Sequence, residues 1–209
     1  MDFQYIHNQL EVKGYVEIEN FLNLSQIKQI KKFINEKKNE LNKSNFSLAN
    51  KELDHPVFNE ILCSKHIEEL SDCLIGSISS KYKNLEKHVV LGVRSNFSKN
   101  KKKIKKNTAF HFDAYYLTIN IPITMPENLT NENREVKSGD LLIIPNFRKF
   151  SNSLIKNIIF KTLMQNTITR YLLGLNILNK LLNIQRIKLS NSKIYLFYGF
   201  RALHGVDTN

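Results

Sequence analysis

The stretch Phe110-His111-Phe112-Asp113 decides the fold that this sequence suggests, because it sets a histidine and a carboxylate two positions apart. Side chains two positions apart in a strand point to the same side, so His111 and Asp113 can reach one metal ion if residues 109–123 are extended. His204 provides a further histidine late in the chain. Two histidines and one carboxylate are the ligands that hold a non-haem Fe(II) ion on one face and leave its other positions open.

Strand-like runs lie beside both parts of this ligand set. Beyond Asp113, Leu117, Ile119, Ile121 and Ile123 alternate with smaller or polar residues, which is the period-two pattern of a half-buried strand. His204 follows a second strand-like run, residues 194–198, which is broken at Gly199. Because the His-x-Asp spacing is a weak signal by itself, the interpretation depends on these neighbouring strands.

Other segments occur in an order that supports the same interpretation. Residues 14–22, followed by Ser25, form a strand-like run and a helix start; Arg94-Ser95-Asn96 precedes the metal motif; and residues 138–146 form a strand and turn between the two metal segments. Taken with the metal motif, these segments resemble the phytanoyl-CoA dioxygenase-like family of Fe(II)- and 2-oxoglutarate-dependent oxygenases. The order of the segments is stronger evidence than any one of them.

The resemblance implies an α+β fold with a double-stranded β-helix core, also called a jelly roll or cupin-like fold. We expect one domain over residues 1–209, with flanking N-terminal helices and a helical insertion at about 150–186. Ser25 is predicted to cap a helix that runs to about Leu41, and a second helix is predicted within residues 60–83. Strands are predicted over residues 88–97, 109–123, 140–145, 188–189 leading into 194–198, and 202–206.

The resemblance also assigns roles to individual residues. His111, Asp113 and His204 would hold Fe(II) and carry the catalysis, with 2-oxoglutarate as co-substrate. Asn96 would hydrogen-bond the end of 2-oxoglutarate near the metal, while Arg94 would face the substrate. From its strand parity with Asp113, Tyr115 is expected to line the same pocket, unless a bulge gives that role to Tyr116.

One feature of the family is missing from this sequence. The family holds the far carboxylate of 2-oxoglutarate with an arginine on the last strand, but this chain stops at Asn209, five residues after His204. We expect a fragment that lacks its last strand, because a closed antiparallel roll needs that strand to cover an edge. The alternatives are that Arg94 or Arg201 substitutes for the anchor, or that the protein is not an oxygenase.

The charge of the chain bears on its partners. The formal net charge is +12, and six lysines between Lys99 and Lys106 account for half of it. We interpret this run as a solvated loop; the alternative is a guide for an anionic substrate such as a phosphate, a coenzyme A ester or nucleic acid. Tight nucleic-acid binding is not expected, because no aromatic residues suited to base stacking alternate with these lysines.

The expected function is therefore hydroxylation of a small-molecule or acyl substrate by a non-haem iron dioxygenase. Two alternatives remain: a cupin-like metal-binding domain without turnover, and a basic nucleic-acid-binding module. The apolar residues between 146 and 185 predict a helical cap, with a substrate lid or a membrane-surface helix as alternatives. Neither a signal peptide nor a long apolar run is visible, so we expect a soluble, cytoplasmic protein. The substrate and the oligomeric state cannot be inferred from the sequence.

Overall fold

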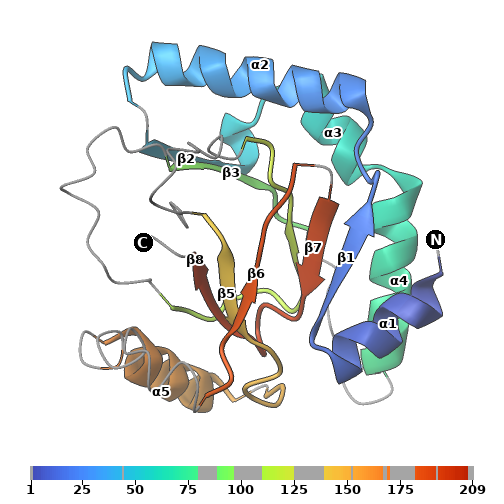
Figure 1. Ribbon diagram of the computed structural model, residues 1–209, viewed down its shortest axis with the longest axis vertical. Helices are drawn as coiled ribbons and strands as arrows, with labels where there is room; N and C mark the ends of the chain where they lie inside the picture. Colours follow the sequence, from blue (N-terminus) through green and yellow to red (C-terminus); the bar gives the residue numbers. More distant parts are fainter. Residues whose placement is uncertain are drawn as a thin grey trace, which may run out of the picture. The chain divides into compact units, whose positions relative to one another are not determined.

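The computed structural model describes residues 2–43, 45–79, 89–96, 110–124, 139–151, 153–166, 169, 182–191 and 193–206, without the side chains of residues 45, 75–79, 94–96, 154 and 165. This part of the chain combines helices with antiparallel sheets (Figure 1). The chain divides into two compact units: residues 1–8 and 22–101 form the first, and residues 9–21 and 102–209 form the second. The single domain predicted over residues 1–209 stays a prediction.

The first unit combines helices with a two-stranded sheet. Strands β2 (Asn45–Ala49) and β3 (Gly92–Asn96) pair antiparallel. Among the helices, the rings of Phe33 and Phe58 meet edge to face, with their centroids 5.0 Å apart. The helical elements of this unit are the start of α1 (Phe3–Val12), α2 (Leu24–Glu40), a 3-10 turn (Asn50–Glu52), α3 (Pro56–Leu62) and α4 (Lys65–Ser79). Neither α1 nor β2 was expected from the sequence.

Helix α2 begins two residues earlier than expected, because Asn23 rather than Ser25 is its N-cap. The side-chain oxygen of Asn23 accepts a hydrogen bond from the backbone N–H of Gln26 at 2.9 Å. The side-chain oxygen of Gln26 accepts one in return from the backbone N–H of Asn23 at 3.0 Å, which completes a capping box. The predicted cap at Ser25 was therefore wrong, although the helix itself was correctly predicted.

The second predicted helix, within residues 60–83, is in fact two helices. α3 starts earlier, at Pro56, where a proline is tolerated because the first helical N–H has no partner within the helix. The helical conformation is interrupted between Leu62 and Lys65, where the Ser64 hydroxyl accepts a hydrogen bond from the Ile67 N–H at 3.4 Å. α4 then continues to Ser79.

In its described residues, the second unit contains two antiparallel sheets of three strands each (Figure 1). In the first sheet, β7 (Lys193–Phe197) lies between β1 (Tyr15–Glu19) and β4 (Thr118–Asn120). In the second, β5 (Leu141–Ile144) lies between β6 (Gln185–Ile187) and β8 (Leu203–Val206). The predicted strands near 140–145, 194–198 and 202–206 are thereby confirmed with small changes at their ends.

The strand predicted over residues 109–123 was wrong for most of its length. Only Thr118–Asn120 is a strand, while residues 114–116 bend and His111 takes part in an isolated bridge to His204. The physical reason is that this segment serves two sheets. Its first residues bond to the segment that holds β8, whereas Thr118–Asn120 pair with β7, so the chain must turn between them.

Strand β5 is buried on both faces, which explains its uninterrupted apolar sequence. Leu141 and Ile143 point into a cluster shared with side chains of β7, so the two three-stranded sheets meet there. Leu142 and Ile144 point the other way, into a second cluster that also contains Phe110 and Phe112 and against which Met164 of α5 (Leu154–Gln165) packs.

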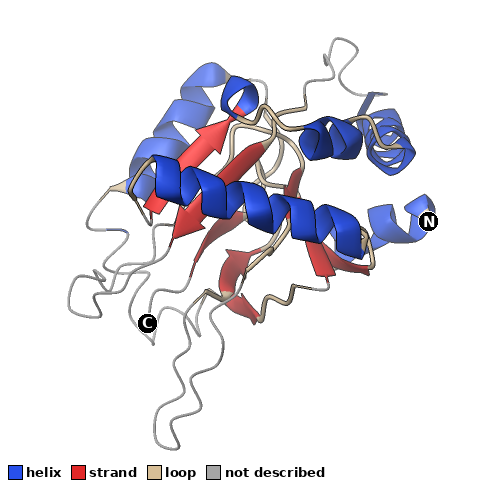
Figure 2. Ribbon diagram, turned by 90° about the horizontal axis from the view of Figure 1, so that it is seen from above, coloured by secondary structure: helices blue, strands red, loops and turns tan. Residues whose placement is uncertain are grey.

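Helix α5 falls within the insertion predicted at about 150–186, but residues 170–181 lie outside the described part, as do the six lysines between 99 and 106. Figure 2 shows the same helices and strands from above, with the residues that are not described in grey. Among the described residues, no helix is both long enough and apolar enough to cross a membrane.

The capping box of α2 provides a first prediction. Replacing Asn23 by Ala removes the acceptor for the Gln26 N–H and should lower the free energy of unfolding by about 1 kcal/mol. Replacing Ser25, the cap expected from the sequence, should change it by less than about half of that amount. Urea unfolding followed by circular dichroism measures both, and a larger loss for Ser25→Ala would contradict the assignment.

Candidate metal site

The three residues predicted as metal ligands meet in the second unit. The Nε2 atom of His111 lies 3.5 Å from Asp113 Oδ1, and the Nε2 atom of His204 lies 3.4 Å from Asp113 Oδ2. One ligand atom from each residue lies within 4.8 Å of the others. In the described part of the chain, no other group of three or more histidine, cysteine or acidic side chains comes as close.

Backbone hydrogen bonds bring the two distant segments together. The His111 N–H donates to the His204 carbonyl at 2.8 Å, and the His204 N–H donates back to the His111 carbonyl at 3.0 Å. Two residues further on, the Asp113 N–H donates to the Gly199 carbonyl at 3.0 Å. These three bonds align residues 111–113 antiparallel to the segment that leads into β8.

The alternation of residues 110–113 decides which side chains face the site. Phe110 and Phe112 are buried in the apolar cluster with Leu142 and Ile144. The intervening His111 and Asp113 point the other way and remain partly exposed, with 32% and 23% of their side chains accessible. His111 and Asp113 therefore face the same side, as expected from their spacing, even though the strand is short, and their role as metal ligands stays a prediction.

His204 is the buried member of the set, with 7% of its side chain exposed. Its Nδ1 atom donates to the Ala202 carbonyl at 3.1 Å, which leaves Nε2 as the atom that can bind a metal. Its ring lies against Phe197, with the ring centroids 4.7 Å apart. The orientation of this ligand is thus set by both a hydrogen bond and an apolar contact.

Asp113 is held in its ionised form. Burial raises the pKa of this carboxyl, but hydrogen bonds from His111, His204 and Thr118, together with the charge of His204, outweigh burial and hold the pKa well below its usual range. The Thr118 hydroxyl donates to Asp113 Oδ2. An ionised carboxylate is the form that a metal ligand requires.

Sequence reasoning missed two residues of the site, Thr118 and Gly199. A Cβ atom at position 199 would lie 2.6 Å from Asp113 Oδ2 and would also overlap Thr118 Oγ1. Only glycine leaves room there for the carboxylate and its hydroxyl partner. The break in the strand pattern at Gly199 was a local signal, but nothing in the sequence relates either residue to Asp113.

Two predicted cofactor-binding residues lie in the first unit. Arg94 and Asn96 belong to β3, and their side chains are outside the described residues, so their roles stay predictions. Tyr115 lies in the bend at residues 114–116 with 47% of its surface exposed, so the strand-parity argument does not extend to it. Its role in the pocket likewise stays a prediction.

Arg201, one of the two arginines considered for holding the far carboxylate of 2-oxoglutarate, already contacts Glu11. Its Nη1 atom lies 2.8 Å from Glu11 Oε1, and its guanidinium lies over the Tyr198 ring at 5.0 Å. Tyr116 also packs on Tyr198, with ring centroids 4.8 Å apart. An anionic co-substrate at Nη1 would therefore compete with Glu11.

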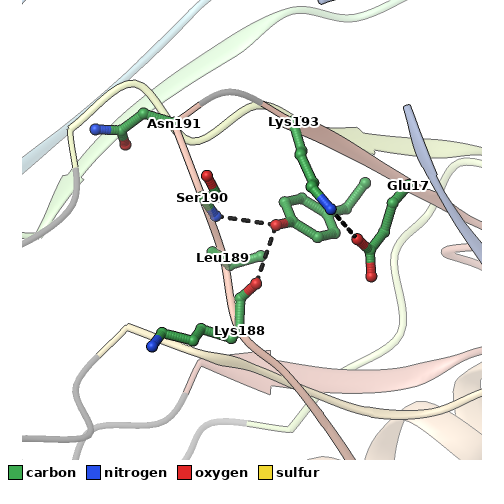
Figure 3. A pocket seen from close by; sticks show the side chains of 7 residues that line it. Glu17, Lys188, Leu189, Ser190, Asn191 and Lys193 are labelled. Atoms are coloured by element: carbon green, nitrogen blue, oxygen red, sulfur yellow. Dashed lines mark hydrogen bonds and ion pairs between the residues drawn. The ribbon is translucent and has the colours of Figure 1, made fainter. Parts of the chain in front are cut away.

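A surface hollow of about 360 Å³ lies elsewhere in the second unit (Figure 3). Its polar groups pair with one another: the Tyr195 hydroxyl accepts from the Ser190 N–H at 2.9 Å and donates to the Lys188 carbonyl at 3.0 Å, while Lys193 contacts Glu17 at 3.0 Å. None of the three ligand residues lines this hollow. Its contacts support the connection between β6 and β7 and do not bear on the metal site.

The chain is similar to known proteins in its fold and not in its sequence. No protein-family model matches the chain, and no curated protein matches its sequence. The fold is similar to that in the crystal structure of a Pseudomonas putida prolyl-4-hydroxylase, with a TM-score of 0.55. The alignment covers 98% of this chain and 90% of the other at 8% sequence identity, so the likeness is one of fold.

Gly199 provides a second prediction. In Gly199→Ala, the added methyl group must displace the side chains of Asp113 and Thr118, so metal affinity should fall at least about tenfold, with an overpacking loss of about 1–3 kcal/mol in stability. Gly92→Ala is the matched control, because its Cβ would make only an ordinary 3.6 Å contact with the Leu48 carbonyl. Co(II) titration and urea unfolding measure the two effects. Wild-type affinity in Gly199→Ala would contradict the close packing described here.

Thr118 provides a third prediction. Thr118→Val keeps the shape of the side chain but removes the hydroxyl that orients the Asp113 carboxylate, so Co(II) affinity should fall about 10- to 100-fold with little change in melting temperature. Thr118→Ser keeps the hydroxyl and should retain most of the affinity. Equal affinity in all three proteins would show that the hydroxyl does not orient the ligand.

Proposed function

We propose that this chain is an Fe(II)- and 2-oxoglutarate-dependent oxygenase built on a double-stranded β-helix core. The observation that carries the proposal is the convergence of His111, Asp113 and His204, since two histidines and one carboxylate are the facial ligand set of non-haem Fe(II) oxygenases. The fold, similar to that of a prolyl-4-hydroxylase, supports it independently of those side chains.

The residues of the site suit such a metal. His111 and His204 would each supply Nε2, and Asp113 would supply a carboxylate oxygen. When bound together with 2-oxoglutarate, iron supplies the activation of O2 that hydroxylates a carbon–hydrogen bond. The chain contributes ligand orientation through Ala202 and Thr118, and it seals the His204 side of the site against water with Phe197. Substrate would approach from the side of His111 and Asp113, the more exposed ligands.

The substrate we propose is a small molecule or an acyl compound, as expected for a phytanoyl-CoA dioxygenase-like protein. This substrate class is supported by the order of the sequence segments alone, since no protein-family model matches the chain. The similar structure is that of a prolyl-4-hydroxylase, but at 8% identity its substrate cannot be transferred to this chain. An anionic substrate would also suit the net charge of +12.

A second candidate function is metal binding without turnover. The observation that favours it is the ion pair between Arg201 and Glu11, which occupies one of the two arginines considered as anchors for 2-oxoglutarate. In that case the ligand set would bind a metal and the co-substrate would not be consumed. The two functions differ in a single measurable reaction, the conversion of 2-oxoglutarate to succinate and CO2.

The fourth prediction tests the ligand set. Anaerobic titration with Fe(II) should give about one site per chain, and Asp113→Ala and His204→Ala should each lose most of the affinity, because each removes one of three ligands. His66→Ala is the matched control, since His66 is an exposed histidine of α4 outside the site. Unchanged Fe(II) binding in both ligand variants would exclude the site.

Turnover is measured on the same proteins. With Fe(II), O2 and 2-oxoglutarate, the oxygenase should release succinate, and the release should stop in Asp113→Ala and His204→Ala. Arg94→Ala should then lose co-substrate affinity if Arg94 is the anchor, while retaining its Fe(II) site. A protein that binds Fe(II) but forms no succinate with any candidate substrate would instead support the second function.

A further inference from the structure

Arg148 lies behind the metal site in an unusual environment. Its side chain is buried, and the central carbon of its guanidinium lies 4.1 Å from the centroid of the Phe112 ring and 4.0 Å from that of the Phe200 ring. Its Nε atom donates to the Phe200 carbonyl at 2.7 Å. One planar cation therefore contacts two aromatic rings and a backbone carbonyl at the same time.

The two rings belong to the two segments that carry the metal ligands. Phe112 stands between His111 and Asp113 in the sequence. Phe200 follows Gly199, whose carbonyl accepts the hydrogen bond from the Asp113 N–H. The backbone N–H of Arg148 also donates to the Arg201 carbonyl at 3.1 Å, so the arginine is bonded to the turn before β8 through both backbone and side chain.

Burying an arginine at this position costs free energy that a residue which only filled the space would not cost. Burial lowers the pKa of the Arg148 guanidinium, and its Nη1 atom is buried without a hydrogen-bond partner among the described residues. A hydrocarbon side chain of similar size would fill the same volume without leaving a buried donor. Arginine differs by offering a flat cation that attracts ring faces together with a donor that can reach a carbonyl.

We infer that Arg148 is a positioning residue for the metal site, which sets the spacing between the segment of His111 and Asp113 and the segment of His204 by binding Phe112 and Phe200 together. The inference rests on the proposed function for its consequence at the metal. Arg148 acts through the aromatic residues that stand beside the ligands in the sequence, Phe112 and Phe200.

The fifth prediction uses two variants and one control. Arg148→Met fills the space without charge or donor, and Arg148→Lys keeps the charge without the planar group. With Co(II) as the probe, both should fold, lose about 10- to 100-fold in affinity and shift the visible absorption bands of the bound ion, which report ligand geometry. Arg186→Met is the control, because Arg186 is an arginine on β6 that pairs with Asp140 at 3.4 Å, away from the ligand segments.

A metal-free measurement separates this inference from the proposed function. Without metal, hydrogen exchange at the Asp113 amide should accelerate in both Arg148 variants, while the amides of β7, the central strand of its sheet, keep wild-type rates. If wild-type protein fails to bind Co(II), the proposed function fails, and the exchange rates still decide the role of Arg148. Wild-type exchange at Asp113, or equal acceleration throughout the second unit, would overturn the inference. If Arg148→Met does not fold, the comparison is made with Arg148→Lys alone.

Discussion

The reciprocal pair of backbone hydrogen bonds between His111 and His204 is the constraint on which the site depends. These residues are far apart in the chain, and their side chains come together because their backbones exchange bonds at 2.8 and 3.0 Å. The third bond, from Asp113 to Gly199, leaves this register across the turn before β8 and brings one carboxylate oxygen close to each imidazole. Any change that shifts this pairing by one residue would turn a ligand into the apolar core.

Apolar packing on the opposite side supports that alignment. Phe110 and Phe112 alternate with the ligands and enter the cluster formed by Leu142, Ile144 and Leu203. Since the ligands and the core residues occupy alternate positions of one short segment, the stability of the cluster and the geometry of the site are linked. Arg148 belongs to this supporting layer, where a cation between two rings joins the segments from behind.

The two polar partners of His204 and Asp113 lie at different distances along the sequence from the residues that they bind. Ala202, which accepts the hydrogen bond from His204, is two residues away, whereas Thr118 approaches Asp113 only because the chain bends at residues 114–116 and enters the other sheet. That bend is also why the long strand expected from alternation is interrupted. The apolar residues fall on even positions before the bend and on odd positions after it, and the pairing partners change from β8 to β7.

The sequence by itself indicated the candidate trio of His111, Asp113 and His204, from the chemistry of the residue types and the His-x-Asp spacing. It also indicated the α+β character, the apolar run of β5 and most strand positions, because these follow from local periodicity. The spacing of Asn23 and Gln26, three residues apart as a capping box requires, is also visible in the sequence, although Ser25 was the predicted cap. Only the tertiary structure decided the roles of Thr118, Gly199 and Arg148. Their partners are set by contacts between segments distant in the chain, and neither composition nor period carries information about such contacts.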